Sequence, residues 1–316
     1  MFNLYISQSE LNITDDERNL YPDIKFLEPQ TLNYFQRMSH TIRLSSRYEI
    51  FRFLNIKKDQ IGLATSESYN KKIQAPIVYP QDSTGLCNGV RIVSFMMSAE
   101  TLLSTAYVMR KDNWEESIYL YQRLIQKEKI KKIREFLVKK SEAFYNNIIV
   151  GLPDDVKFLD LSKTYKDIEQ TNDFEHCTIE FPDEMNSICV IDGQHRIFAH
   201  YEGPDNDKNE KCIAQLRKQL HLLVTGLIFP KDMPALERTK IQSEIFLDIN
   251  SNSKPVPADV LLHIEMIKNP FSDIGLARRV LEKLNGKKIF LNKFELSCWL
   301  QKLRLYEIAV RSQHFL

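Results

Sequence analysis

The segment Asp192–Arg196 reads Asp-Gly-Gln-His-Arg and directly follows the apolar run Ile188–Ile191. The apolar run predicts a strand that is buried on both faces, and the Asp-Gly pair after it is typical of a tight turn before a helix. A strand, a tight turn and a helix start together present unpaired backbone N–H groups and the positive end of a helix dipole. His195 and Arg196 add donors and positive charge to the first turn. The segment therefore predicts a site for an anion, most naturally a phosphate.

Less specific explanations of the same residues stay open. Strand–turn–helix units capped by an Asp are common, and Arg196 could simply point into water. Asp192 could cap the helix, which is the simplest role, orient Arg196, or hold a Mg²⁺ ion that accompanies the phosphates. His195 could contact phosphate, transfer a proton, stack on a base or bond to the backbone, so no catalytic residue is assigned. His200 lies off that face of the helix and is expected to be structural.

The composition of the 316-residue chain is that of a globular protein with one or two domains, with 27% charged and 43% hydrophobic residues. The net charge of +1 argues against DNA binding over the whole surface, so any contact with nucleic acid requires a local basic patch. The absence of a leader pattern and of a long apolar run predicts a cytoplasmic protein without membrane contact. An odd number of cysteines without a Cys-x-x-Cys pair favours reduced thiols over a disulfide scaffold or zinc knuckle: Cys87, Cys177, Cys189, Cys212 and Cys298.

The elements that must position the motif are expected on both sides of it. Before the motif, apolar spacing predicts, in order, a helix over 46–54, a strand over 90–95, a helix from Ser98 to Met109, an amphipathic helix over 127–140, and strands over 147–150 and 178–181. After it, the pattern predicts a helix over 212–220, a strand over 221–229, a helix over 233–249, a polar turn over 248–255, and helices over 258–267, 275–284 and 294–308. These elements predict an α/β fold in three parts: an N-terminal mixed α/β subdomain (1–88), a core (89–265) and a C-terminal helical extension (266–316).

The segment Asp192–Arg196 resembles the signature of the DGQHR-domain protein family, which includes the DndB-like and DpdB-like components of bacterial DNA-modification systems. These proteins are in turn similar to the ParB/sulfiredoxin superfamily, in which a Gly-x-x-Arg turn at a helix start holds nucleotide phosphates. The resemblance covers about residues 90–265. It includes Tyr121-Gln122-Arg123 with the helix and strand that follow, and Phe246–Asn250 downstream of the motif.

The resemblance implies an α/β fold with a ParB/sulfiredoxin-like mixed-sheet core, and a nucleoside triphosphate with Mg²⁺, or a DNA phosphate, bound at the turn. The implied phosphate- or nucleotide-binding residues are Asp192, Gly193, Gln194, His195, Arg196, Gln122, Arg123 and Asn250. Arg123 and Arg196 would bring two guanidinium groups to one anion if their strands are neighbours, although Arg123 could instead pair with a surface carboxylate. Asn250 is expected in the same cleft as Arg196. Two departures are the Asp248-Ile249-Asn250 element in place of the Glu-Asn pair of ParB, and an insertion between about residues 155 and 178.

Basic residues cluster in the predicted helix 127–140. Such runs are usually solvated faces, and Glu128 and Glu135 dilute this one. Because the resembled family works on modified DNA, we expect DNA contacts from the following residues of this helix: Lys127, Lys131, Lys132 and Arg134. A second basic group over 278–288 is the next candidate.

The function that follows from the resemblance is that of a component of a bacterial DNA-modification or phage-defence system, such as DNA phosphorothioation. It would bind DNA or nucleotide phosphates through the turn and regulate modification or transcription. Two alternatives stay open: an NTP hydrolase or nuclease of the ParB/sulfiredoxin-like superfamily, and a non-catalytic assembly module. Other DNA-modification proteins are expected as partners, and formation of an oligomer is a further possibility.

Overall fold

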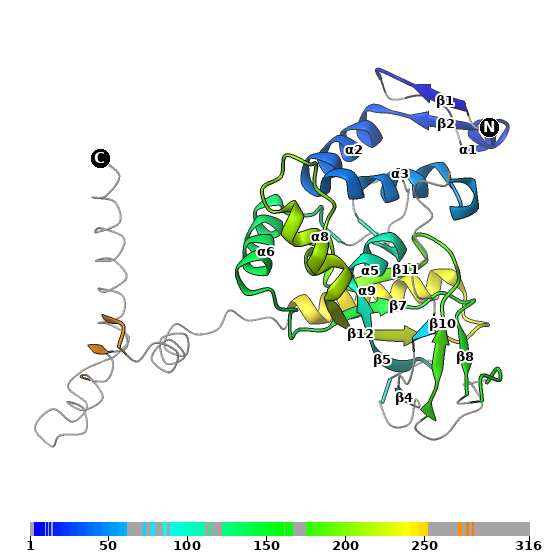
Figure 1. Ribbon diagram of the computed structural model, residues 1–316. Coiled ribbons are helices and arrows are strands. Elements are labelled where there is room, and N and C mark those ends of the chain that lie inside the picture. Colours follow the sequence, from blue (N-terminus) through cyan, green and yellow to red (C-terminus); the bar gives the residue numbers. More distant parts are fainter. Residues whose placement is uncertain are drawn as a thin grey trace, which may run out of the picture. The chain divides into compact units, whose positions relative to one another are not determined.

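The computed structural model describes residues 3–9, 11, 13, 15–61, 72–73, 77–79, 85–86, 89–110, 114, 122–160, 162–166, 175–251, 271–273, 276–277 and 280. The described chain is a mixed α/β protein, as the sequence predicts (Figure 1). It divides into two compact units, Met1–Asp248 and Ile249–Leu316. The expected division into three parts stays a prediction. The expected helices over 258–267 and 294–308 lie outside the described residues.

A mixed sheet forms the centre of the first unit. Its seven described strands, in spatial order, are β6 (Ala106–Tyr107), β11 (Ile188–Asp192), β7 (Ile148–Gly151), β12 (His221–Ile228), β5 (Arg91–Ser98), β4 (Ile77–Tyr79) and β9 (Glu175–His176). The pairs β6–β11 and β7–β12 are parallel, and the other neighbours are antiparallel. The apolar runs of β7 and β11 have few polar residues because both faces of this part of the sheet are covered.

Four helices cover one face of this sheet: α5 (Ala99–Thr105), α6 (Lys127–Lys140), α7 (Gln194–Phe198) and α8 (Glu210–Gln219). Leu102, Ile130 and Leu137 from these helices share a buried cluster with Val150 and Val190 of the sheet. Figure 1 shows α6 beside α8, with α5 and the sheet next to them.

The opposite face of the sheet is covered by α9 (Ala235–Ser251). Ile241 and Ile245 of α9 pack against a second buried cluster that contains Ile191 and Leu227. Among the described residues, no helix has the length and apolar character needed to cross a bilayer.

The N-terminal residues form two parallel strands, β1 (Asn3–Ile6) and β2 (Ile24–Leu27), and the helical elements α1 (Asp15–Asn19), α2 (Pro29–Ile42), η1 (Arg43–Ser46), α3 (Arg47–Leu54) and η2 (Lys58–Gln60). The two terminal nitrogens of the Arg47 guanidinium, Nη1 and Nη2, donate to the carboxylate of Glu202, at 2.7 and 2.8 Å. The backbone N–H of Leu44 also donates to the Glu202 carbonyl, at 3.1 Å. These contacts attach the N-terminal helices to the core.

A small antiparallel sheet contains β3 (Lys72–Ile73), β10 (Thr178–Glu180) and β8 (Lys157–Leu159). β8 and β10 lie at the two ends of the insertion that the sequence predicts between about residues 155 and 178. The insertion therefore begins and ends in paired strands.

The structure confirms several predicted elements and corrects others. Helix α6 has the predicted bounds, and Ser98 caps α5 by accepting a hydrogen bond from the backbone N–H of Thr101, at 3.1 Å. The prediction that α5 runs to Met109 is wrong, because the chain leaves the helix after Thr105 to pair with β11. Helix α9 continues to Ser251, so the polar turn expected from residue 248 does not begin there.

Candidate phosphate-binding site

The turn between β11 and α7 depends on Gly193. Its φ of 103° lies in the left-handed region, and an added Cβ would come within 3.0 Å of the Ile148 side chain. The pairing of β11 with β7 is interrupted just before this turn, where Val190 faces Val150 but Asp192 faces Ile149. This bulge, at the end of the strand, changes the direction in which Asp192 leaves the sheet.

The side chains of Asp192 and Arg196 bind each other. Asp192 Oδ2 lies 2.7 Å from Arg196 Nη2, and the same nitrogen donates to the Asn147 carbonyl at 2.9 Å. The prediction that Asp192 caps the helix is wrong: Gly193 occupies the cap position, and no side chain caps α7. Of the three roles considered for Asp192, orienting Arg196 is the one its contacts support.

Arg196 lies at the edge of the protein interior. Its side chain is 21% exposed, and its Nε is buried without a hydrogen-bond partner among the described residues. An unmet buried donor is unfavourable. The guanidinium therefore has capacity for a further acceptor beyond Asp192 and the Asn147 carbonyl.

His195 connects the turn to the start of α6. Its Nε2 accepts a hydrogen bond from the backbone N–H of Gln126, at 3.2 Å. Burial, followed by the charge of Lys129, lowers the pKa of His195 to about 4. The ring is therefore neutral at pH 7, with its proton on Nδ1, and its Nε2 lone pair is already engaged.

His200 has the structural position expected for it. Its side chain is buried, and its Nδ1 lies 2.9 Å from the Arg196 carbonyl. Burial lowers the pKa of His200 to about 4.

Two predicted phosphate-binding residues, Gln122 and Gln194, are buried and take part in internal hydrogen bonds. The Gln122 amide donates to the Val190 carbonyl. The Gln194 amide accepts from Arg110 Nε and donates to the Arg123 carbonyl, both at 3.2 Å. These side chains hold the segment at 122–123 against the turn, and they are not exposed to a ligand.

Arg110, which precedes α6 in the sequence, lies in the protein interior. It is fully buried, pairs with Glu49, and donates a hydrogen bond from Nη1 to the Tyr34 hydroxyl, at 3.2 Å. Its guanidinium also lies 5.1 Å from the centre of the Phe198 ring. Arg110 thereby links helices α2 and α3 to α7, and burial, followed by the charge of Glu49, raises the pKa of Tyr34.

Arg134 is also unavailable to DNA. Its guanidinium donates to the Ala199 and Tyr201 carbonyls, at 3.2 and 2.9 Å, and pairs with Asp207 and Glu210, at 2.9 and 3.3 Å. Only 4% of its side chain is exposed. Its helical spacing from Ile130 and Leu137 places it on the apolar stripe of α6, a signal that was present in the sequence.

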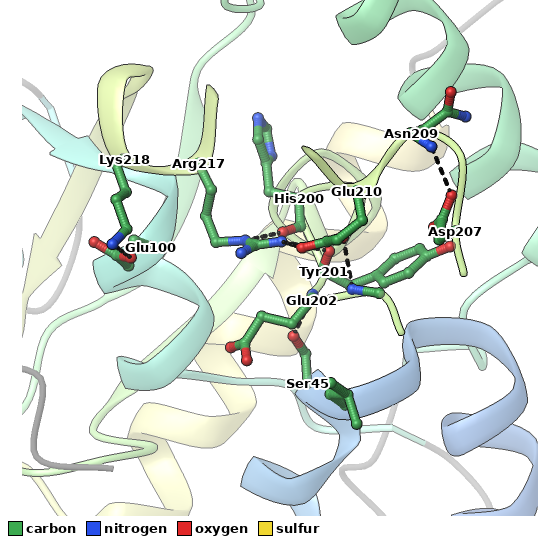
Figure 2. A network of polar contacts seen from close by, with 12 residues as sticks. Ser45, Glu100, His200, Tyr201, Glu202, Asp207, Asn209, Glu210, Arg217 and Lys218 are labelled. Carbon is green, nitrogen blue, oxygen red and sulfur yellow. Dashed lines mark hydrogen bonds and ion pairs between the residues drawn. The ribbon is translucent and has the colours of Figure 1, made fainter. Parts of the chain in front are cut away.

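The carboxylate of Glu210 accepts from a second buried arginine, Arg217, at 2.6 Å. Figure 2 shows Arg217 directed toward Glu210 and toward the backbone of His200, whose carbonyl accepts from Arg217 Nε at 2.7 Å. Glu210 also accepts from the Gly203 N–H at 2.7 Å. This network fixes the loop between α7 and α8 and has no exposed cation to offer a ligand.

The exposed cations beside the turn are Arg123 and the lysines of α6. Among the described residues, none of these side chains forms an ion pair: Arg123, Lys127, Lys129, Lys131, Lys132, Lys139 and Lys140. The exposed surface of α6 carries six lysines and two glutamates, Glu128 and Glu135, so its net charge is positive. Its N-terminal half carries Lys127, Lys129, Lys131 and Lys132 next to His195.

The remaining predicted site residues stay untested. Asn250 lies in the last turn of α9 and belongs to the second unit, so its position beside Arg196 stays a prediction. The basic group over 278–288 lies almost wholly outside the described residues.

The residues around the turn do not fit a Mg²⁺ site. Asp192 supplies one carboxylate, which is bound to Arg196. Among the described residues, no group of three or more His, Cys, Asp or Glu side chains could hold a metal ion. Mg²⁺ takes oxygen ligands, so we assign no step to a metal here.

Compared with protein-family models, with curated proteins and with solved structures, the chain matches none of them.

Proposed function

We propose that the protein binds phosphate groups of DNA or of a nucleotide on one surface, which we call the turn–α6 surface. It consists of the Asp192–Arg196 turn, Arg123 and the lysines in the N-terminal half of α6. As the resemblance of the motif implies, the protein would act as a DNA-binding, regulatory component of a DNA-modification or phage-defence system. A ParB/sulfiredoxin-like core and a cytoplasmic location belong to the same proposal.

The observation that carries the proposal is the hydrogen bond from the Gln126 N–H to His195. It joins two cationic segments that are about 70 residues apart in sequence. Arg123 and Lys129 are exposed on either side of this contact, without ion pairs to described residues. Cations that lie together without ion pairs are able to neutralise a phosphate group. Neutralising phosphates supplies the part of the affinity for DNA that does not depend on its sequence.

A double substitution tests the proposal. Arg123→Gln with Lys129→Gln should weaken binding of a fluorescently labelled DNA duplex by roughly tenfold or more at low salt. The matched control is Lys218→Gln with Lys240→Gln, which removes the same charge from side chains that are 64% and 63% exposed. If the two double variants weaken DNA binding equally, only the net charge of the protein matters. The proposal that DNA binds at the turn–α6 surface would then be wrong.

A structural role of the turn is the second candidate, favoured by the ion pair between Asp192 and Arg196. In that case Arg196→Gln lowers stability and leaves the affinity for DNA and for ATP, CTP and GTP unchanged. Release of inorganic phosphate from one of these nucleotides would instead indicate an NTP hydrolase.

A further inference from the structure

A cleft of about 600 Å³ lies on the sheet face that α9 covers, between α9 and α3. The lining residues that matter for binding are Arg52, Tyr107, Asp154, Glu184, Arg238 and Gln242. Ser187 precedes β11 and Cys189 lies near its start, whereas Asp192 lies at its other end, about 16 Å from Ser187 and about 10 Å from Cys189 at the usual rise of a strand. None of the lining residues belongs to the turn–α6 surface, so the cleft is a separate place in the first unit.

The charged side chains of the cleft are two arginines, Arg52 and Arg238, and two carboxylates, Asp154 and Glu184. Arg238 pairs with Asp154 and lies 5.5 Å from the centre of the Phe229 ring, but its Nε is buried without a partner among the described residues. Asp154 is 61% exposed, so its ion pair with Arg238 contributes little and an incoming anion can replace it. An anionic oxygen would also satisfy the unmet Nε donor.

Gln242 adds an amide to the floor of the cleft. Its side chain is 4% exposed, and its Oε1 accepts from the Cys189 thiol at 3.4 Å. With Oε1 used in this way, the amide N–H₂ group lies against Gly151, where a Cβ would collide with it. Because Gly151 and Gln242 both line the cleft, the amide is held at its wall.

Another part of the wall is formed by a guanidinium, an aromatic ring and apolar side chains. The Arg52 guanidinium lies 4.5 Å from the centre of the Tyr107 ring, and Met109, Leu152 and Pro153 complete the wall. A guanidinium stacked on an aromatic ring presents a planar surface that also attracts anions. The volume lies within the range of roughly 300 to 1,000 Å³ that is usual for small-molecule sites.

We infer that this cleft binds a small planar anion, namely a ring that carries a phosphate or carboxylate group. The anionic group is bound by Arg238, with Gln242 as a second donor, and the ring lies against Arg52, Tyr107 and Met109. This inference does not depend on the proposed binding of DNA at the turn–α6 surface.

Isothermal titration calorimetry with AMP and with 4-hydroxybenzoate tests the inference, and adenosine and inorganic phosphate test the ring and the anion separately. At least one of the two planar anions should bind at millimolar concentration or below, and more tightly than adenosine or phosphate. Arg238→Gln should weaken that binding about tenfold or more. Lys240→Gln, two residues along the same helix and outside the cleft lining, should leave it within about twofold.

Met109→Trp gives a second test that keeps both arginines and fills part of the cleft, and it should also weaken binding. Thermal unfolding without ligand shows whether each variant is folded. Preference for AMP identifies a phosphate ligand, and preference for 4-hydroxybenzoate identifies a carboxylate ligand. The inference is overturned if neither planar anion binds. It is equally overturned if binding survives in Arg238→Gln and Met109→Trp but is lost in Arg123→Gln, because the anion then binds at the turn–α6 surface.

Discussion

The backbone N–H of Gln126 donates a hydrogen bond to Nε2 of His195, at 3.2 Å, so helix α6 begins directly against the Asp192–Arg196 turn. Gln194 strengthens the same junction through its bond to the Arg123 carbonyl. The junction brings the exposed lysines of α6 and the arginine of the motif to one part of the molecule. The first two predictions depend on this relationship.

Lys131→Glu with Lys132→Glu should weaken binding to all DNA sequences alike. It should also make the dependence of affinity on salt concentration less steep, by about one unit of the log–log slope for each lost phosphate contact. Lys139→Glu with Lys140→Glu makes the same change in charge at the end of α6 that is farther from the turn, and its effect should be smaller. The measurement is the duplex affinity over a series of salt concentrations. An unchanged slope in the first variant would move the contact away from α6.

Asp192→Asn should raise the affinity for DNA severalfold at low salt. The substitution keeps the side-chain shape but removes the negative charge 2.7 Å from the Arg196 guanidinium, so a phosphate no longer competes with a carboxylate. The side chains are 21% and 33% exposed, and the free energy of unfolding should fall by only about 1 kcal/mol. Asp16→Asn, at an exposed carboxylate outside both proposed sites, serves as the control for charge alone. A lower affinity in Asp192→Asn would mean that Asp192 positions Arg196 for binding.

Local patterns in the sequence predict the elements around the motif well. The repeat of apolar residues and lysines predicts α6 with its observed bounds, and apolar runs predict β11 and β12. These features depend on residues that are close in sequence. The early end of α5 depends instead on the pairing of Ala106 and Tyr107 with β11, about 80 residues later, which local propensity does not contain.

The candidate site is predicted less completely, because exposure depends on partners that are distant in sequence. Gly193 and Arg196 lie at the turn as expected, but Gln122 and Gln194 are buried. Arg110 is buried because Glu49, 61 residues before it, provides a carboxylate for its charge. No spacing rule relates these two residues, so the sequence gives no sign of their contact.

Arg134→Met should lower the free energy of unfolding by about 3 to 5 kcal/mol, because it leaves buried carbonyls and carboxylates without their cation. The partners that lose Arg134 are Asp207, Glu210 and the carbonyls of Ala199 and Tyr201. Lys132→Met, on the exposed side of the same helix, should change stability by less than about 0.5 kcal/mol. Urea unfolding followed by circular dichroism measures both values. Similar losses in the two variants would show that Arg134 is not held as described.

Stability should decrease as the pH is lowered from 6.5 toward 4. Burial lowers the pKa of both His195 and His200 to about 4, compared with 6.5 for an ordinary histidine. Within this window the unfolded chain binds protons that the folded protein excludes, so the stabilisation is complete above pH 6.5 and is lost as the pH falls. The loss reaches up to about 3 kcal/mol for His200 and is smaller for His195, whose partly exposed side chain is screened by solvent. Urea unfolding at pH 7.5, 6.0 and 5.0 measures the loss, which should be smaller in His200→Asn and smallest in the variant that also carries His195→Asn. Equal stability of the original protein at pH 7.5 and 5.0 would contradict the neutral, buried state of both rings, and with it the hydrogen bond from Gln126 to His195.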